Sequence, residues 1–265
     1  MLFRLDSLAL ALVVLALVGG ATAGGIAAGR LIEEHRGTTR ESVGAAQGAL
    51  LGFVGLLLAF GMTMAVGRYE SRRAAVVDEA NAIDTTYLRA QTLAEPERGE
   101  SLTLLRQYTD SRLALSRAVP GTVGFRKASD TSGTIQNQLW GFAGSALAKD
   151  PTGSATRLYV DSLNGMIDMH TVRVSALDNR VPTTVVYLQL LGGAFAVGLL
   201  AMYLAMLGRS VTTAILAAAM VCLILLVSLD LDRPVRGLIT IPSTPIAALR
   251  VSMDQPPAAT APAPR

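Results

Sequence analysis

Two short clusters of polar residues stand beside long apolar runs of the sequence, and they are its main candidates for chemistry. The first cluster contains Arg68, Arg72, Arg73, Glu79 and Asn81, and the second contains Asp230, Asp232 and Arg233. The carboxylates of the second cluster suit ion pairs with the arginines of the first, or a hard cation, which prefers carboxylate oxygen. Because two carboxylates are too few for a complete calcium site, we favour ion pairing and predict no metal site.

Other reactive residue types are scarce. The single cysteine, Cys222, lies within an apolar run, where a free thiol behaves as a small apolar residue. The two histidines, His35 and His170, lie far apart in the chain, and His170 continues an apolar helix face, which is typical of a packing residue. The sequence contains no phosphate-binding loop, dinucleotide-binding glycine pattern, metalloprotease histidine pair or hydrolase nucleophile motif. We therefore predict neither an enzyme nor a cofactor.

Composition points to a lipid environment. Of the 265 residues, 51% are hydrophobic and only 16% are charged, whereas a soluble domain carries roughly 25% charged residues. The net charge of +3 is too small for the electrostatic footprint of a nucleic-acid-binding protein. The lipid bilayer is thus the predicted partner, and no nucleic acid is expected.

Four runs of the sequence lack charged residues and are long enough to cross a membrane. They cover about residues 7–29, 43–67, 181–208 and 210–229. A bilayer-spanning helix needs about 20 apolar residues. The fold class predicted is an all-α membrane protein with four transmembrane helices and a helical domain inserted between the second and third spans.

The first run has a second interpretation. A basic start, an apolar stretch and Ala21-Thr22-Ala23 are together typical of a cleavable signal peptide. Cleavage would leave three spans and place the insert on the other side of the membrane. The apolar run continues to Gly29, however, which favours a transmembrane helix.

The insert, residues 68–180, is rich in charged residues, and its sequence pattern predicts helices. A first helix is expected to continue from the second span to near Pro96, because no glycine or proline interrupts the chain after Gly67. Further helices are expected from Pro96 to Pro120, over 134–149 and over 154–180, with a loop at 122–133. Apolar residues recur at helical spacing along three of these segments. They are Val76, Ala80, Ile83, Tyr87 and Ala90; Leu102, Leu105, Tyr108 and Leu115; and Val160, Leu163, Ile167, Val174 and Leu177. These stripes suit either a self-contained bundle or the assembly of subunits.

The second span carries two distinct faces. Gly44, Gly48 and Gly52 repeat every four residues, a pattern that lets helices approach closely. Beside them lies an apolar ridge formed by Phe53, Leu57, Phe60 and Met64. This ridge suits contact with lipid, or a hydrophobic constriction that gates ions by dewetting. No span contains a charged residue, so the proton relays of pumps and coupled transporters have no candidates.

These features together resemble the bacterial bestrophin-like membrane domain family. The resemblance covers about residues 42–241 and rests on the glycine-rich second span, Arg68-Tyr69-Glu70-Ser71-Arg72-Arg73 and the later Asp230-Leu231-Asp232-Arg233-Pro234. It implies a pentameric ion channel whose second helix lines an axial pore with an apolar neck. On that template Phe53, Leu57, Phe60 and Met64 are the neck candidates. The chain departs from the family in its short first loop, its neck residues and its reduced acidic cluster after the fourth span.

The sequence thus predicts four segments: a transmembrane hairpin over 1–67, a cytoplasmic helical domain over 68–180, a second hairpin with an exit turn over 181–241, and a tail over 242–265 that is disordered at its end. Basic residues are more frequent beside the spans on the side of both termini and the insert, which places that side in the cytoplasm. The predicted function is a homo-oligomeric channel for inorganic ions in the bacterial inner membrane. The alternative is a non-conducting scaffold or sensor whose cytoplasmic helices dock a partner protein.

Overall fold

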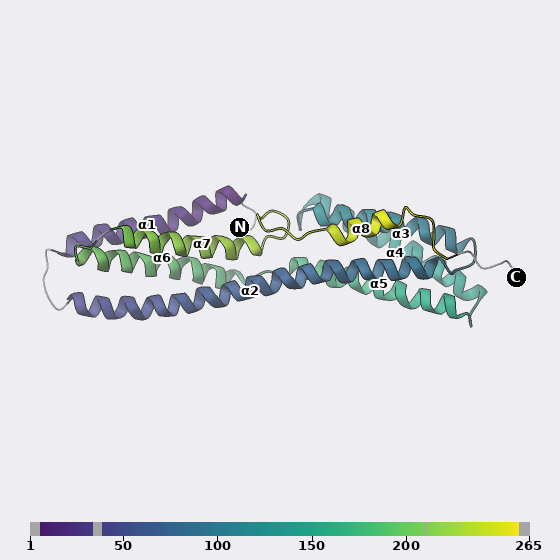
Figure 1. Cartoon of the computed structure of the whole chain (residues 1–265), viewed down its shortest axis with the longest axis horizontal. Coiled ribbons are helices and arrows are strands. Elements are labelled where there is room, and N and C mark those ends of the chain that lie inside the picture. The colour runs from purple at the N-terminus through teal and green to yellow at the C-terminus, as the bar shows by residue number, and fades with distance from the viewer. Residues whose placement is uncertain (1–5, 34–38, 210, 260–265) are drawn as a thin grey trace. The chain divides into compact units, whose positions relative to one another are not determined.

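The computed structural model describes residues 6–33, 39–209 and 211–259, and within these ranges every regular element is a helix. The helices are α1 (Ser7–Glu33), α2 (Thr39–Ala90), α3 (Glu97–Arg117), α4 (Val123–Lys149), α5 (Ser154–Asp178), α6 (Thr183–Met206), α7 (Val211–Leu231) and α8 (Thr244–Ser252) (Figure 1). The expected all-helical class is confirmed. His35 and the last six residues of the expected tail lie outside the described residues.

The chain divides into two units. One, here called the apolar unit, contains Met1–Tyr69 and Arg180–Thr240; the other, the charged unit, contains Glu70–Asn179 and Ile241–Arg265. Helix α2 contributes its first part to the apolar unit and its second part to the charged unit. Its continuation to Ala90 confirms the single long helix that the sequence predicts after Gly67.

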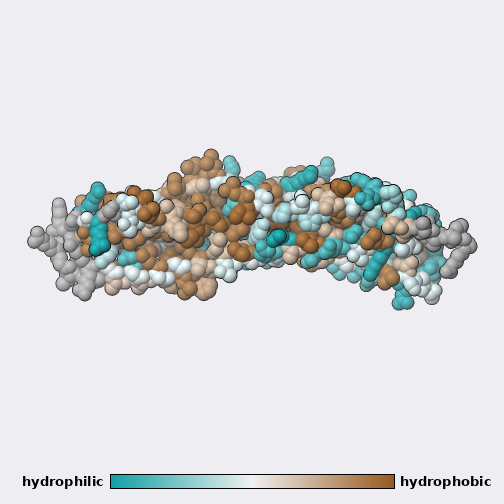
Figure 2. Space-filling model, in the orientation of Figure 1, coloured by the Kyte–Doolittle hydropathy of each residue, from teal (hydrophilic) through white to brown (hydrophobic). Residues whose placement is uncertain are grey.

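The apolar unit contains four helices that are long and apolar enough to cross a membrane. They lie within Ser7–Ile32, Val43–Ala90, Ser154–Met206 and Val211–Leu231, the third contributing α6. Their large apolar side chains are extensively exposed, as expected of surfaces that face lipid rather than water. Figure 2 shows hydrophobic residues gathered over this unit.

Helices α1 and α6 approach closely through glycine. A Cβ placed on Gly25 would collide with the backbone of Gly198, and one placed on Gly29 would collide with the backbone of Met202. Small residues allow such backbone approach in membranes, where lipid provides no hydrophobic drive between helices. Gly25 and Gly29 therefore pack α1 against α6, whereas Gly20 and Gly24 have open space beside them.

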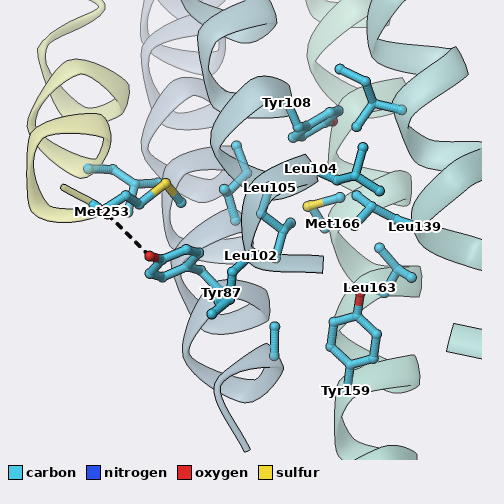
Figure 3. Close-up of a cluster of buried hydrophobic side chains, with 14 of the residues drawn as sticks. Tyr87, Leu102, Leu104, Leu105, Tyr108, Leu139, Tyr159, Leu163, Met166 and Met253 are labelled. Carbon is cyan, nitrogen blue, oxygen red and sulfur yellow. Dashed lines mark hydrogen bonds between the residues drawn. The ribbon is translucent and has the colours of Figure 1, made fainter. Parts of the chain in front are cut away.

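The charged unit is a helical bundle with its own hydrophobic core. Buried side chains from α2, α3, α4, α5 and α8 meet there, including Tyr87, Leu105, Leu139 and Leu163 (Figure 3). All the predicted buried residues of the first two stripes are buried, and those of the third are buried or half-buried. The stripes thus pack against one another and form the core of this unit, while the assembly of subunits stays a prediction.

Two expectations for this unit are wrong. Residues 123–133, expected as a loop, form the first turns of α4. Thr122 caps this helix by accepting a hydrogen bond from the backbone of Phe125 at 3.4 Å. Burial of Phe125 and Ala128 against Leu115 outweighs the weak helix propensity of the glycine, serine and threonine residues there.

The second error concerns the tail. Residues 244–252 form α8, and Ile246, Leu249 and Met253 enter the core of the charged unit. The hydroxyl of Tyr87 donates a hydrogen bond to the carbonyl of Met253 at 3.2 Å, as Figure 3 shows. Trp140, the single tryptophan of the sequence, is 47% exposed on α4.

Candidate functional site

The membrane-crossing part of α2 buries only one narrow face in its own chain. Val54, Leu58 and Ala65 belong to the core of the apolar unit. On the other side Phe53 is 62% exposed and Phe60 is 61% exposed. A wide apolar face of α2 is therefore not covered by the other described residues.

The four neck candidates divide between these faces. Phe53 and Phe60 point out of the chain, whereas Leu57 and Met64 are half-buried. Met64 packs against the core of the apolar unit. A Cβ at Gly192 on α6 would lie 3.8 Å from Cδ2 of Leu57, which places Leu57 beside that helix.

The glycine face of α2 is also split. A Cβ at Gly44 would lie 2.8 Å from the hydroxyl of Tyr203 on α6, so this glycine does permit a close approach within the chain. In the part of the chain that the structure describes, nothing lies within 4 Å of the same position at Gly48, Gly52 and Gly55. This stretch of small residues borders the exposed aromatic ridge and leaves room for a neighbouring helix.

The second polar cluster organises the turn that follows α7. The Asp230 carboxylate accepts hydrogen bonds from the backbone of Leu238 at 2.9 Å and of Ile239 at 2.8 Å. A Cβ at Gly237 would approach this carboxylate within 2.7 Å, so the turn closes tightly around it. Asp230 is thus a turn-forming residue, consistent with the exit turn that the sequence predicts after the fourth span.

Asp232 and Arg233 fasten the same turn to other parts of the apolar unit. Asp232 accepts a hydrogen bond from the backbone of Val181, just before α6, at 3.1 Å. Arg233 donates to the hydroxyl of Ser7 at 3.2 Å, and Ser7 in turn donates to the carbonyl of Arg236 at 3.0 Å. The start of α1, the start of α6 and the end of α7 are therefore joined by polar contacts at one end of this unit.

The first polar cluster does not act as one group. Arg68 belongs to the apolar unit. Arg72 is buried and donates to the carbonyls of Ala176 and Asn179 at the end of α5, at 3.1 and 2.7 Å. Arg73 pairs with Glu70 on the surface at 3.7 Å, and Asn81 is exposed. Ion pairing between the two clusters stays a prediction.

Glu79 departs most from its expected place at a membrane boundary. Its carboxylate is fully buried in the charged unit, where Oε1 accepts a hydrogen bond from Nε of Arg112 at 2.6 Å and Oε2 accepts one from Arg173. Arg112 lies on α3 and Arg173 on α5, so one carboxylate joins three helices. Sequence reasoning missed both arginines because neither stands near Glu79 in the sequence.

His170 adjoins the same group. Nη1 of Arg112 lies 2.9 Å from Nδ1 of His170. Because a guanidinium only donates, Nδ1 must accept, and the proton of the neutral ring sits on Nε2. Burial lowers the pKa of His170 to about 4, and the charges of Arg112 and Arg173 act in the same direction, opposed by Glu79.

Tyr108 forms the apolar wall of the group and stays protonated. Burial raises its pKa to about 12. The Arg112 guanidinium lies 5.9 Å from the centre of its ring, and its hydroxyl accepts a hydrogen bond from Gln136 at 3.1 Å. Among the described residues no three His, Cys, Asp or Glu side chains gather closely enough to hold a metal ion.

The chain is an all-helical membrane protein by class: it has four helices that are apolar enough to cross a membrane and a helical bundle that contains buried charges. Residues 10–246 match the family model described as Bestrophin-like domain, so the chain belongs to the bestrophin-like family, a family of channel proteins. The resemblance predicted from the sequence is thereby confirmed.

The fold is similar to that of a bacterial bestrophin homologue from Klebsiella pneumoniae. The two chains share 12% sequence identity, the similarity covers 89% of this chain and 96% of that chain, and the TM-score is 0.69. A point variant of that homologue gives 12% identity, coverage of 89% and 97%, and a TM-score of 0.67. No curated protein sequence matches this chain.

Proposed function

We propose that this chain is the subunit of a homo-oligomeric ion channel in the bacterial inner membrane, with α2 lining the pore. One observation carries the proposal: the membrane-crossing part of α2 presents an apolar face that residues 6–33, 39–209 and 211–259 of its own chain leave uncovered. Phe53, Leu56 and Phe60 are all more than half exposed on this face. Membership of the bestrophin-like family and the similarity to a bacterial bestrophin homologue support the same function.

The two sides of this face suit two roles in a ring of subunits. Gly48, Gly52 and Gly55 would admit the α2 helix of a neighbouring subunit, because small residues let helix backbones approach in lipid. The aromatic ridge would then face the axis and form a constriction that excludes water when closed. By resemblance to bestrophins, the ring contains five subunits.

The aromatic ridge is the proposed neck. Phe53 and Phe60 are its strongest members, since both point out of the chain and lie two helical turns apart on α2. Leu57 and Met64 are half-buried and contribute less. Both termini and the charged unit are cytoplasmic in this proposal, because basic residues are more frequent on that side of the spans.

Conductance of purified protein in planar bilayers tests this proposal. Wild type is expected to conduct small inorganic ions, and Phe60→Ala is expected to raise conductance or open probability severalfold, because a smaller apolar side chain weakens dewetting. Phe195→Ala is the matched control: this α6 residue is 65% exposed, close to the 61% of Phe60, and lies outside the proposed neck.

Two results would reject the proposal. If the protein conducts but Phe60→Ala and Phe195→Ala have the same conductance, α2 does not line the pore. A monomeric particle that does not conduct, and that retains a stoichiometric partner through its charged unit, would favour the scaffold or sensor.

A further inference from the structure

The buried group around Glu79 holds more positive than negative charge. Glu79 and Arg112 have no exposed side-chain surface, and the side chain of Arg173 is 4% exposed. Two guanidinium groups therefore share one carboxylate. His170 offers Arg112 an acceptor but no charge, since its Nδ1 carries no proton. Tyr108 is neutral, with its pKa raised to about 12 by burial.

The same group also has more donors than acceptors. Arg112 uses Nε for Glu79 and Nη1 for His170. Arg173 uses Nη1 for Glu79 and Nη2 for the hydroxyl of Ser116. Among the described residues, Nη2 of Arg112 and Nε of Arg173 have no hydrogen-bond acceptor, although both atoms are buried. Each guanidinium that binds Glu79 thus keeps one buried nitrogen without an acceptor.

We propose that this group binds one small monovalent anion, of halide size, through Nη2 of Arg112 and Nε of Arg173. Taking a charge out of water costs several kcal/mol unless an opposite charge compensates it. A water molecule would satisfy the two donors but leave the surplus charge, whereas one monovalent anion balances both charge and donors. The anion is small because both donor atoms are buried in the seam where α2, α3 and α5 meet at Glu79.

The anion would hold three helices together. Glu79 lies on α2, Arg112 on α3 and Arg173 on α5, so a bound anion neutralises the repulsion between the two arginines across this seam. The inference does not depend on conduction: it predicts an anion site in the charged unit whether or not the chain forms a channel.

Thermal unfolding of the full chain in detergent tests the site. Wild type is compared in sodium chloride and in sodium gluconate at equal ionic strength, gluconate being too large for the seam. Chloride is expected to raise the unfolding midpoint in a saturable way, by about 3 °C, since a ligand of the folded state stabilises it by mass action.

Two variants and one direct measurement complete the test. Arg173→Gln removes the surplus charge and is expected to abolish the chloride response. Arg250→Gln removes a half-buried arginine that pairs with Asp110 and Asp254 away from Glu79, and should keep the response. Crystals grown in bromide should show anomalous scattering beside Arg112. The proposal is overturned if wild type has the same unfolding midpoint in both salts, or if the crystals show no bromide beside Arg112. If Arg173→Gln does not fold, the bromide crystals alone decide.

Discussion

Gln189 on α6 lies directly against Gly61 on α2, within the apolar unit. The Gln189 side chain is buried, and its Nε2 donates to the carbonyl of Leu57, one turn before Gly61, at 3.4 Å. A Cβ on Gly61 would overlap the amide of Gln189. A polar side chain in the span thus satisfies one of its donors on the backbone of the proposed pore helix, and it can do so only where that helix lacks a side chain.

Gly61→Ala is expected to weaken this contact between α2 and α6. The added methyl group must displace Gln189 from Leu57, and overpacking of this kind costs about 1–3 kcal/mol. Thermal unfolding of the detergent-solubilised protein measures the loss. Gly67→Ala is the control on the same helix, because a Cβ there meets nothing within 4 Å. Equal midpoints for the two variants would show that Gln189 moves aside freely.

The contact between α1 and α6 leads to a second prediction. Gly25→Leu would force α1 away from the backbone of Gly198, whereas Gly24→Leu places its side chain in open space. The first variant should lower the unfolding midpoint by several degrees, because close backbone approach is lost. The second should leave it nearly unchanged. The prediction fails if Gly24→Leu is the more damaging change.

Much of this fold follows from patterns that are local in the sequence. The four spans are predicted from runs of apolar residues, and the buried faces of α2 and α3 from the helical spacing of apolar residues. Both patterns can be recognised without knowledge of tertiary contacts. The start of α4 was mispredicted because its glycine, serine and threonine residues are poor helix formers. Only the burial of Phe125 and Ala128 against distant helices makes it helical.

Of the two candidate sites, one could be predicted from the sequence and the other could not. The exposed aromatic ridge of α2 could be predicted, since Phe53 and Phe60 lie on one helix. The environment of Glu79 could not be, because its partners Arg112 and Arg173 stand 33 and 94 positions away. Neighbouring arginines in the sequence suggested a membrane-boundary cluster, yet the helix turns Glu79 inward while its neighbour Asp78 remains exposed.

Glu79→Gln should be severely destabilising. The substitution removes the carboxylate that the buried Arg112 and Arg173 share, and breaking a buried charge pair costs about 3–5 kcal/mol. Asp78→Asn is the matched control, since it removes an adjacent carboxylate that is exposed. Denaturant unfolding of both variants measures the difference. A Glu79→Gln protein as stable as Asp78→Asn would mean that the two arginines are solvated in solution.

The histidine beside these arginines should make stability depend on pH. Three charged groups face it: Glu79 of α2, Arg112 of α3 and Arg173 of α5. Its pKa in the folded chain is about 4, below the ordinary value of 6.5, chiefly because of burial. The unfolded chain therefore binds a proton at His170 more readily than the folded chain does, so this residue's contribution is fully present above pH 6.5 and is lost as the pH falls toward 4.

His170→Asn isolates that contribution, because an asparagine can still accept a hydrogen bond from Arg112 but does not titrate. Wild type should lose stability relative to the variant as the pH falls from 6.5 to 4, while the difference between them stays constant above pH 6.5. Chemical unfolding of both proteins across this range measures the difference directly and cancels the carboxylates that they share. A difference that does not vary with pH would mean that His170 has the same proton affinity folded and unfolded, and hence that it is not held neutral against Arg112.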